Sequence, residues 1–367
     1  MKAECVRERL RAAVALVEKI TGKHLSLPVL NAILVEATSD QLVLKATNLD
    51  LGIELSVPAT VEKKGIVAVP GSLFGTVLGS VADEHSLKLE SVNDNLYLSG
   101  SHHSTLLRSL PTEDFPSIPR IDGGESFSIH SSRFVQGLRA TWYAASVSDM
   151  KPEIASVNVY SDVSAIVCVA TDSFRLAEKR IEVEEKFTAF PPMLIPIKNV
   201  IEIIRILEQV NGNLVITANK NQVSFTAPSL YLTSRLVGGV FLNYRQIIPV
   251  GYKTLVTIPK RELTNALKMG QIFSDKFSQV QFKIMPKEQL FEISSRNTET
   301  GETTTRVDAA LEGEELEIGF NVRYILDCFQ SIPEESVTLS FNGVGKTMLV
   351  NAVGNNSFTY LVMPMTR

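Results

Sequence analysis

The chain has 367 residues, with 36 Lys and Arg against 40 Asp and Glu, which gives a formal net charge of −4. This length suits two or three domains, and the three isolated cysteines, Cys5, Cys168 and Cys328, imply neither a disulfide framework nor a thiolate metal site. Such cysteines favour a reduced cytoplasm as the location, and no run approaches the ~18 consecutive apolar residues that a membrane span needs, so no membrane contact is expected.

The first third of the chain predicts two helices among several strands. Residues 6–20 are expected to form an amphipathic helix and not a signal peptide, because charges interrupt the apolar run and its apolar members recur at helical spacing. A second helix is expected at 72–80, with Ser72 as its N-cap. Alternating apolar residues predict strands at 27–37, 41–57, 86–90 and 95–100.

The same order of elements returns twice in the rest of the chain. Pro70, Pro196 and Phe320 precede helices that we interpret as equivalent, at separations of 126 and 124 residues. Strand pairs with alternating apolar residues lie between the helices. The remaining helices are expected at 131–143, 194–210, 259–270 and 319–332.

Two short segments, ATNLDL from Ala46 and ATDSFRL from Ala170, each follow an apolar run and predict a strand that leaves its sheet through a polar turn. Their threonines, Thr47 and Thr171, are 124 residues apart, and ISSRNTET from Ile293 is a degenerate third copy. The recurrence indicates duplicated domains of α+β class, each with two helices packed on antiparallel sheets. The predicted boundaries are 1–122, 123–251 and 252–367.

Four segments also carry a family resemblance: ATDSFRLA, TLVTIP with its following helix, GFNVRYILDCF and the C-terminal YLVMPM. Together they resemble the bacterial replicative sliding clamp, the β subunit of DNA polymerase III, nearly from end to end. The resemblance implies a DNA clamp fold, in which a head-to-tail homodimer forms a closed ring with its helices inside. It implies a processivity factor that encircles duplex DNA in replication and repair, without catalysis or cofactors. The implied partners are the clamp loader, the DNA polymerase III alpha subunit and other proteins with a clamp-binding motif.

The charge of the predicted helices fits contact with DNA. Helices 6–20, 131–143 and 259–270 each carry +2 and the other three are neutral, which leaves −10 for the rest of the chain. Solvated surface helices also carry Lys and Arg, so charge alone identifies no partner. With the resemblance, salt-sensitive and sequence-independent contacts with double-stranded DNA are expected from Arg7, Arg11, Lys23, His24, Arg133, Arg139, Ser148, Lys151, Lys198, Arg205, Lys260 and Lys268.

The resemblance further implies a groove between the second and third repeats, where partner proteins insert a short motif with hydrophobic anchors. Methionine and branched aliphatic side chains would make an adaptable apolar cleft, with Arg175 as a polar fixing point. Taken singly and without the resemblance, core packing and a last strand are the better interpretation. The residues carried over by position are Ile154, Thr171, Ser173, Phe174, Arg175, Leu176, Leu242, Gln246, Ile247, Val344, Val362, Met363, Pro364 and Met365, flanked by Phe277, Asn321 and Tyr324.

Three departures from the family pattern affect this pocket. They are Ser173-Phe174 in place of the usual Gly-His, Leu242 and Gln246 in place of proline and arginine, and Thr366-Arg367 in place of a basic-then-apolar end. We therefore expect a pocket that is present but reshaped, with an altered preference among peptide motifs.

For dimerisation, the resemblance implies that a strand edge of the first repeat meets the end of a helix in the third. Strand edges carry unpaired backbone groups, and pairing two of them satisfies both. The residues implied are Thr105, Leu107, Gln271, Ile272 and Phe273.

Two other classes of function compete with a clamp. An enzyme could use Asp172 beside Arg175, or the His102-His103 pair, but the chain lacks HExxH, P-loop, GxGxxG and GxSxG motifs. Adjacent side chains of an extended segment point apart, so a metal shared by the two histidines is not expected. Asp172 is expected to cap the turn after its strand. A scaffold that binds only proteins would keep the pocket and lack the positive helices.

Overall fold

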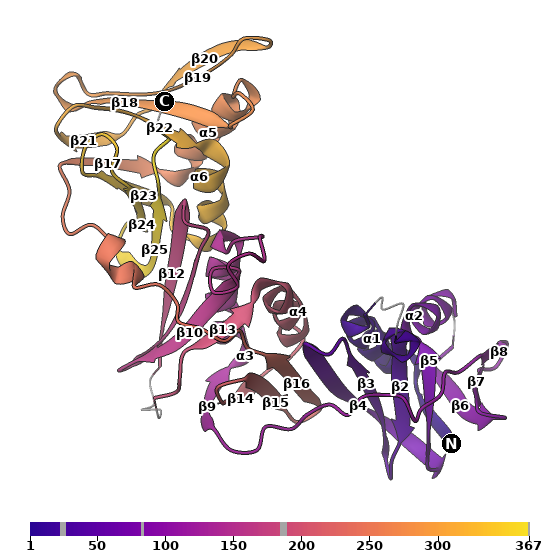
Figure 1. Ribbon diagram of the computed structural model, residues 1–367. Coiled ribbons are helices and arrows are strands. Elements are labelled where there is room, and N and C mark those ends of the chain that lie inside the picture. The colour runs from indigo at the N-terminus through magenta and orange to yellow at the C-terminus, as the bar shows by residue number, and fades with distance from the viewer. Residues whose placement is uncertain (23–26, 82–83, 184–188, 366–367) are drawn as a thin grey trace. The chain divides into compact units, whose positions relative to one another are not determined.

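The computed structural model describes residues 1–22, 27–81, 84–183 and 189–365. The chain divides into two compact units, Met1–Ser132 with Phe187–Leu236, and Arg133–Lys186 with Val237–Arg367. We call these unit 1 and unit 2 and describe each by itself (Figure 1). The predicted domain boundaries, 122/123 and 251/252, do not coincide with these limits and stay predictions.

Unit 1 is built on one antiparallel sheet that joins the first and second predicted repeats. Its strands follow the order β8-β7-β6-β1-β4-β16-β15-β14-β9, and β3, β2 and β5 extend in turn from β4. The two repeats meet where β4 pairs with β16, with Leu55 opposite Leu230. The strands of this sheet are β1 (Lys2–Val6), β2 (Ala32–Ala37), β3 (Gln41–Thr47), β4 (Leu51–Lys63), β5 (Gly65–Pro70), β6 (Ser86–Val92), β7 (Asn95–Ser99), β8 (Ser104–Leu107), β9 (Glu125–His130), β14 (Asn213–Ala218), β15 (Gln222–Ala227) and β16 (Leu230–Arg235). A further strand of this part of the chain, β13 (Met193–Pro196), does not belong to the sheet.

Unit 2 contains two antiparallel sheets. One follows the order β10-β11-β12-β25-β24-β23-β17-β21, and the other is the four-stranded sheet β20-β19-β18-β22 (Figure 1). The strands are β10 (Ser156–Asp162), β11 (Ala165–Thr171), β12 (Arg175–Glu182), β17 (Thr254–Pro259), β18 (Gln279–Met285), β19 (Leu290–Asn297), β20 (Gly301–Arg306), β21 (Ala310–Gly313), β22 (Leu316–Asn321), β23 (Ser336–Phe341), β24 (Met348–Ala352) and β25 (Asn355–Val362).

The described residues contain two α-helices for each predicted repeat, which confirms the α+β class. Each buries an apolar stripe, as Leu10 and Val17 show in the first helix. The expected N-cap Ser72 is wrong, because Pro70 occupies the cap position and Ser72 lies in the first helical turn. No helix in the described parts of the chain is long and apolar enough to cross a membrane. The helices are α1 (Arg7–Val17), α2 (Gly71–Ser80), α3 (Ser131–Thr141), α4 (Ile197–Leu207), α5 (Lys260–Ile272) and α6 (Val322–Cys328), with 3-10 turns η1 (Glu18–Ile20), η2 (Pro28–Asn31), η3 (Trp142–Ala144), η4 (Tyr244–Ile247), η5 (Pro286–Glu288) and η6 (Phe329–Ser331).

The turn between β3 and β4 is fixed by side chains of the ATNLDL segment. The Thr47 hydroxyl donates to the Leu51 carbonyl (2.7 Å) and accepts from the Leu49 backbone N–H (3.0 Å). Asn48 Oδ1 accepts from the Leu51 N–H (2.8 Å), and Leu49 adopts a left-handed φ of 76°. Short polar side chains thus replace the ladder bonds that the strands lose at the turn.

The three cysteine thiols are buried, and burial raises the pKa of Cys5 and of Cys168 to about 12 and the pKa of Cys328 still further. Since the thiolate is the reactive form, we expect N-ethylmaleimide at pH 7.5 to leave the folded protein unmodified. Intact mass spectrometry checks this, and three additions should appear once guanidinium chloride unfolds the chain. Stoichiometric labelling of the folded protein contradicts the prediction.

Candidate functional site

The turn between β11 and β12 repeats the geometry of the β3–β4 turn. The Thr171 hydroxyl donates to the Arg175 carbonyl (2.6 Å) and accepts from the Ser173 N–H (3.1 Å), and the φ of Ser173 is 78°. Asp172 Oδ1 accepts from the N–H groups of Phe174 and Arg175, both at 2.9 Å. These bonds confirm the recurrent strand-to-turn motif and the capping role expected of Asp172.

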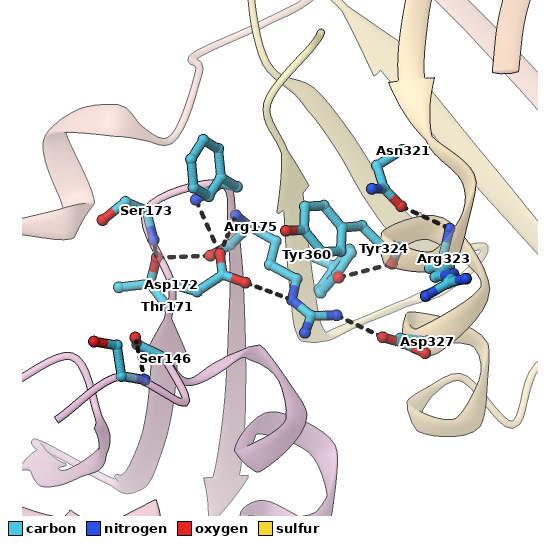
Figure 2. A network of polar contacts seen from close by, with 12 residues as sticks. Ser146, Thr171, Asp172, Ser173, Arg175, Asn321, Arg323, Tyr324, Asp327 and Tyr360 are labelled. Carbon is cyan, nitrogen blue, oxygen red and sulfur yellow. Dashed lines mark hydrogen bonds and ion pairs between the residues drawn. The ribbon is translucent and has the colours of Figure 1, made fainter. Parts of the chain in front are cut away.

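Arg175 connects this turn to α6 (Figure 2). Its Nε lies 2.9 Å from Asp172 Oδ2 and its terminal nitrogen lies 2.6 Å from Asp327 Oδ2 on α6. The guanidinium also lies 4.5 Å from the centre of the Tyr324 ring, a cation–π contact. The Arg175 side chain is only 12% exposed. Burial by itself disfavours its charged form, but Tyr360, Asp327 and Asp172 outweigh burial and raise its pKa, so the cation is permanent.

The C-terminal strand brings the chain end against the same turn. β12 pairs with β25, which places Val362 opposite Arg175, and the Met363 N–H donates to the Phe174 carbonyl (2.8 Å). The Phe174 side chain is 60% exposed and the Met363 side chain is also exposed. Two apolar side chains, 189 residues apart in sequence, therefore stand side by side at the end of this sheet.

A buried cluster next to this end of β12 and β25 supports η4. Tyr244 packs with Leu176 and Leu361, and its hydroxyl donates to the carboxylate of the buried Glu178. The Tyr160 hydroxyl lies 2.6 Å from the Tyr244 hydroxyl. Burial raises the pKa of Tyr244, and the hydrogen bond to Glu178 raises this pKa further. The hydroxyl therefore stays protonated and remains a donor. The cluster fixes the position of η4, whose side chains include the exposed Gln246 and Ile247.

A second contact, between Arg245 of η4 and Asp162 of β10, also holds η4 in place. Asp162 at the end of β10 accepts from Arg180 (2.8 Å) and from Arg245 (2.9 Å). The hydrogen bond from Arg180, opposed by burial and assisted by Arg245, lowers the pKa of Asp162. The carboxylate therefore stays ionised at neutral pH and keeps η4 tied to β10.

A hollow of about 340 Å³ lies next to the chain end in unit 2. Val344, Gly319, Pro364 and Met365 contribute to its lining. The Met365 N–H donates to the Gly319 carbonyl (2.9 Å), so the tail extends along β22 after it leaves β25. The lining of this hollow therefore combines apolar side chains of the chain end with polar side chains of the four-stranded sheet.

The structure brings most of the expected pocket residues together in groups within unit 2. One group is Phe174, Arg175, Leu176, Val362 and Met363 at the β12–β25 end. Buried members such as Thr171, Leu176 and Val362 support the surface without forming it. Among the other expected residues, Leu242, Gln246 and Ile247 lie close to Tyr244 in sequence, and the hollow is lined by Val344, Pro364 and Met365. Tyr324 contacts Arg175, and Asn321 donates to the Phe277 carbonyl (3.1 Å). The Ile154 carbonyl accepts from the Ser146 N–H.

Sequence reasoning missed three contributors to this site: Tyr244, Glu178 and Asp327. The sequence of β12, RLAEKRIE, is mostly charged and does not single out Glu178, although a buried carboxylate needs a donor. The donor lies 66 residues away, so the pair itself is visible only in the fold.

The expected DNA-facing residues differ in their freedom to reach phosphates. Lys23 and His24 lie outside the described residues. Arg7 is poorly placed for such a contact, because its side chain is only 11% exposed and pairs with Glu8. Lys260 donates to the Ile332 carbonyl, so this ammonium is already engaged. Arg133 likewise donates to the Glu182 carbonyl, and Arg205 donates to Glu202 (2.7 Å). The expected residues with exposed side chains are Arg11, Arg139, Ser148, Lys151, Lys198, Arg205 and Lys268.

The expected dimer residues lie on an edge strand of unit 1 and at a helix end of unit 2. Thr105 and Leu107 belong to β8, the edge of its sheet. The side chain of Leu107 is buried, with 2% exposed, whereas that of its neighbour Leu106 is 54% exposed and is the better placed of the two for a contact between copies. Side chains alternate along a strand, and the sequence does not show which face the core takes. Gln271, Ile272 and Phe273 form the end of α5 and its cap, where Ile272 is exposed.

Comparison with known proteins gives matches over nearly the whole chain. Three family models match, described as the DNA polymerase III beta subunit N-terminal domain (residues 1–119), central domain (128–243) and C-terminal domain (245–366). A beta sliding clamp of Synechococcus elongatus is 26% identical over 374 residues, with 100% of this chain and 99% of that protein covered. One of Staphylococcus aureus is 25% identical over 95% of this chain and 94% of its own length.

Solved structures show the same fold. A DnaN sliding clamp from Pseudomonas aeruginosa, bound to griselimycin, is 26% identical with a TM-score of 0.95 and full coverage of both chains. The DNA polymerase III beta subunit of Thermotoga maritima is 22% identical with a TM-score of 0.93, covering 100% of this chain and 99% of its own.

Proposed function

The chain belongs to the DNA polymerase III beta subunit family and has its three-domain DNA clamp fold, and from this we infer that it is a DNA sliding clamp. In this function the protein catalyses no reaction. It encircles duplex DNA as a homodimeric ring in the cytoplasm and keeps the replicative polymerase on its template.

The observation that carries this proposal is the pair of exposed apolar side chains at the end of β12 and β25, Phe174 and Met363, which we call the apolar rim. Phe174 and Met363 are exposed above a buried support that consists of Arg175 and Tyr244 with their partners. Exposed apolar side chains on a rigid base are typical of sites for hydrophobic peptide anchors. The ligands we propose are the clamp-binding motifs of the DNA polymerase III alpha subunit, of the clamp loader and of other replication and repair proteins.

The DNA contacts we propose come from exposed cations on the helices. Arg11, Arg139, Lys198 and Lys268 are exposed on α1, α3, α4 and α5, in a protein whose net charge is −4. Cations gathered on helices attract phosphates, and the acidic remainder repels them. Contacts of this kind ignore base sequence and weaken with salt, as sliding requires.

The dimer we propose uses two sheet edges. β8 ends the sheet of unit 1 and β20 ends the four-stranded sheet of unit 2, so each exposes unpaired backbone groups. Exposed Leu106 beside one edge and Ile272 near the other would cover each other when two copies pair head to tail. Two such contacts close a ring.

The test is retention on DNA. The free protein is expected to sediment as a dimer. After loading onto nicked circular duplex DNA by a clamp loader and ATP, it is expected to stay on the DNA through gel filtration. Cutting the circle with a restriction enzyme should release it, because a ring slides off a free end. A monomer at micromolar concentration, or equal loss from circular and linear DNA with an active loader, overturns the proposal.

A further inference from the structure

The four-stranded sheet of unit 2 has one buried face and one that meets water. On β18, Val280 and Phe282 are buried, while Gln279, Gln281 and Lys283 alternate with them on the other face. The buried face packs aromatic rings, whereas the polar face borders the candidate site only at the hollow beside Gly319. That polar face shows an ordered pattern across its strands.

One row of this face is uncharged and, apart from Gln281, has small side chains. Gly319 on β22 lies opposite Gln281 on β18, which lies opposite Ser294 on β19, which lies opposite Thr304 on β20. The two flanking rows contain longer side chains, mostly charged, at Glu317, Lys283, Glu292 and Arg306 on one side, and at Asn321, Gln279, Arg296 and Glu302 on the other. Small side chains between long ones make a trough that crosses the strands.

Two hollows coincide with this trough. The first is the hollow of about 340 Å³ beside Pro364 and Met365. The second, of about 440 Å³, lies farther along the sheet and includes Ser294 and Thr304. Both are lined by Gln279, Gln281 and Glu317, so they adjoin. The trough therefore continues directly from the apolar surface at the chain end.

The absence of a side chain at Gly319 lets the side chains of Gln279 and Gln281 lie close to β22 where the two hollows meet. A β-carbon built at this position would stand 2.6 Å from Gln279 Nε2 and 3.0 Å from Gln281 Oε1. The two amide groups therefore lie directly over the glycine. Any side chain at position 319 would push both glutamines outward and narrow the trough where the two hollows meet.

The lining chemistry fits an extended, polar peptide. Side-chain amides and hydroxyls can bond to backbone N–H and C=O groups of a chain laid across them. Over the trough and its two flanking rows, Asp275, Glu292, Glu302 and Glu317 stand against Lys283, Arg296 and Arg306, an excess of one negative charge, and Arg296 lies 3.6 Å from Glu302. The excess of negative charge favours a partner segment that contains Lys or Arg.

We propose that this trough binds an extended, basic and polar segment that flanks the hydrophobic motif of a partner protein whose anchors occupy the apolar rim. The inference rests on the proposed function of that rim. Four strands at about 4.8 Å spacing span roughly 14 Å, which an extended chain crosses in about four residues. The trough thus distinguishes partners by the four residues beside their motif.

Fluorescence polarisation with labelled peptides tests the proposal. The probes are the hydrophobic motif of the polymerase alpha subunit alone, and the same motif extended at either end by Lys-Ser-Thr-Ser or Glu-Ser-Thr-Ser. The lysine extension at one end is expected to lower Kd about fivefold, through two or three neutral hydrogen bonds and one favourable charge. The glutamate extension should give no gain.

Ser294→Lys should abolish the gain from the lysine extension and leave the motif alone unaffected, because Ser294 lines only the far hollow. Ser128→Lys, an exposed strand serine in unit 1, is the matched control and should keep the gain. Binding of the motif without any gain from extension overturns the trough and leaves the clamp function standing. Failure of the motif itself to bind overturns both. Loss of the dimer in Ser294→Lys, measured by sedimentation, would identify the face as a contact between copies and overturn the proposal.

Discussion

Replacing Arg175 with alanine is expected to weaken peptide binding by about tenfold or more and to destabilise the protein by about 3 kcal/mol. The guanidinium is nearly buried and holds Asp172 and Asp327 at 2.9 and 2.6 Å. Removing it leaves two carboxylates without their cation and releases the turn that presents Phe174. Guanidinium chloride unfolding and peptide polarisation measure the two effects.

The matched control is Arg323→Ala, since Arg323 is exposed on the same helix, α6, that carries Asp327 (Figure 2). Its removal should change the free energy of unfolding by less than about 0.5 kcal/mol. Equal behaviour of the two variants contradicts a supporting role for Arg175. A loss of stability without a loss of peptide affinity would separate the network from the pocket.

Replacing Phe320 with alanine should cost about 3–5 kcal/mol of unfolding free energy. This ring is fully buried, with its centre 5.6 Å from the Phe282 ring and 6.2 Å from the Phe341 ring. Phe282 belongs to the four-stranded sheet and Phe341 to the other sheet of unit 2, so the variant opens a cavity where the two sheets meet. Urea unfolding followed by circular dichroism gives the value.

Phe277→Ala is the counterpart on the surface. The ring is 57% exposed and lies beside Asn321 at the edge of the pocket region. We expect a stability change below about 1 kcal/mol, because little apolar area leaves a dry environment. Comparable losses in the two phenylalanine variants would show that the aromatic core is less tightly packed than the structure indicates.

The helices and the repeated turns could be predicted because their signals are local. An apolar stripe such as Leu10 to Val17 lies within a few helical turns. The threonine turns depend on hydrogen bonds that span only two to four residues. The β4–β16 pairing was not predictable in the same way, because any exposed edge offers the same backbone groups.

The candidate site was only partly visible for a related reason. The family pattern located Phe174, Arg175 and Met363, which the structure places at one sheet end. It did not show that Arg175 pairs with Asp327, 152 residues away. Nor could alternation in β8 show that Leu106 faces water and Leu107 the core, because both residues are apolar.

The sequence by itself therefore determined the repeats, the helices, the polar turns and the family, all of which are encoded in short segments or in their spacing. Only the tertiary structure decided which charges are neutralised, which apolar side chains remain exposed, and how Gly319, Gln281, Ser294 and Thr304 align into a trough. These features depend on strand register and on contacts between distant segments, which are selected by the packing of the whole core and by no local propensity.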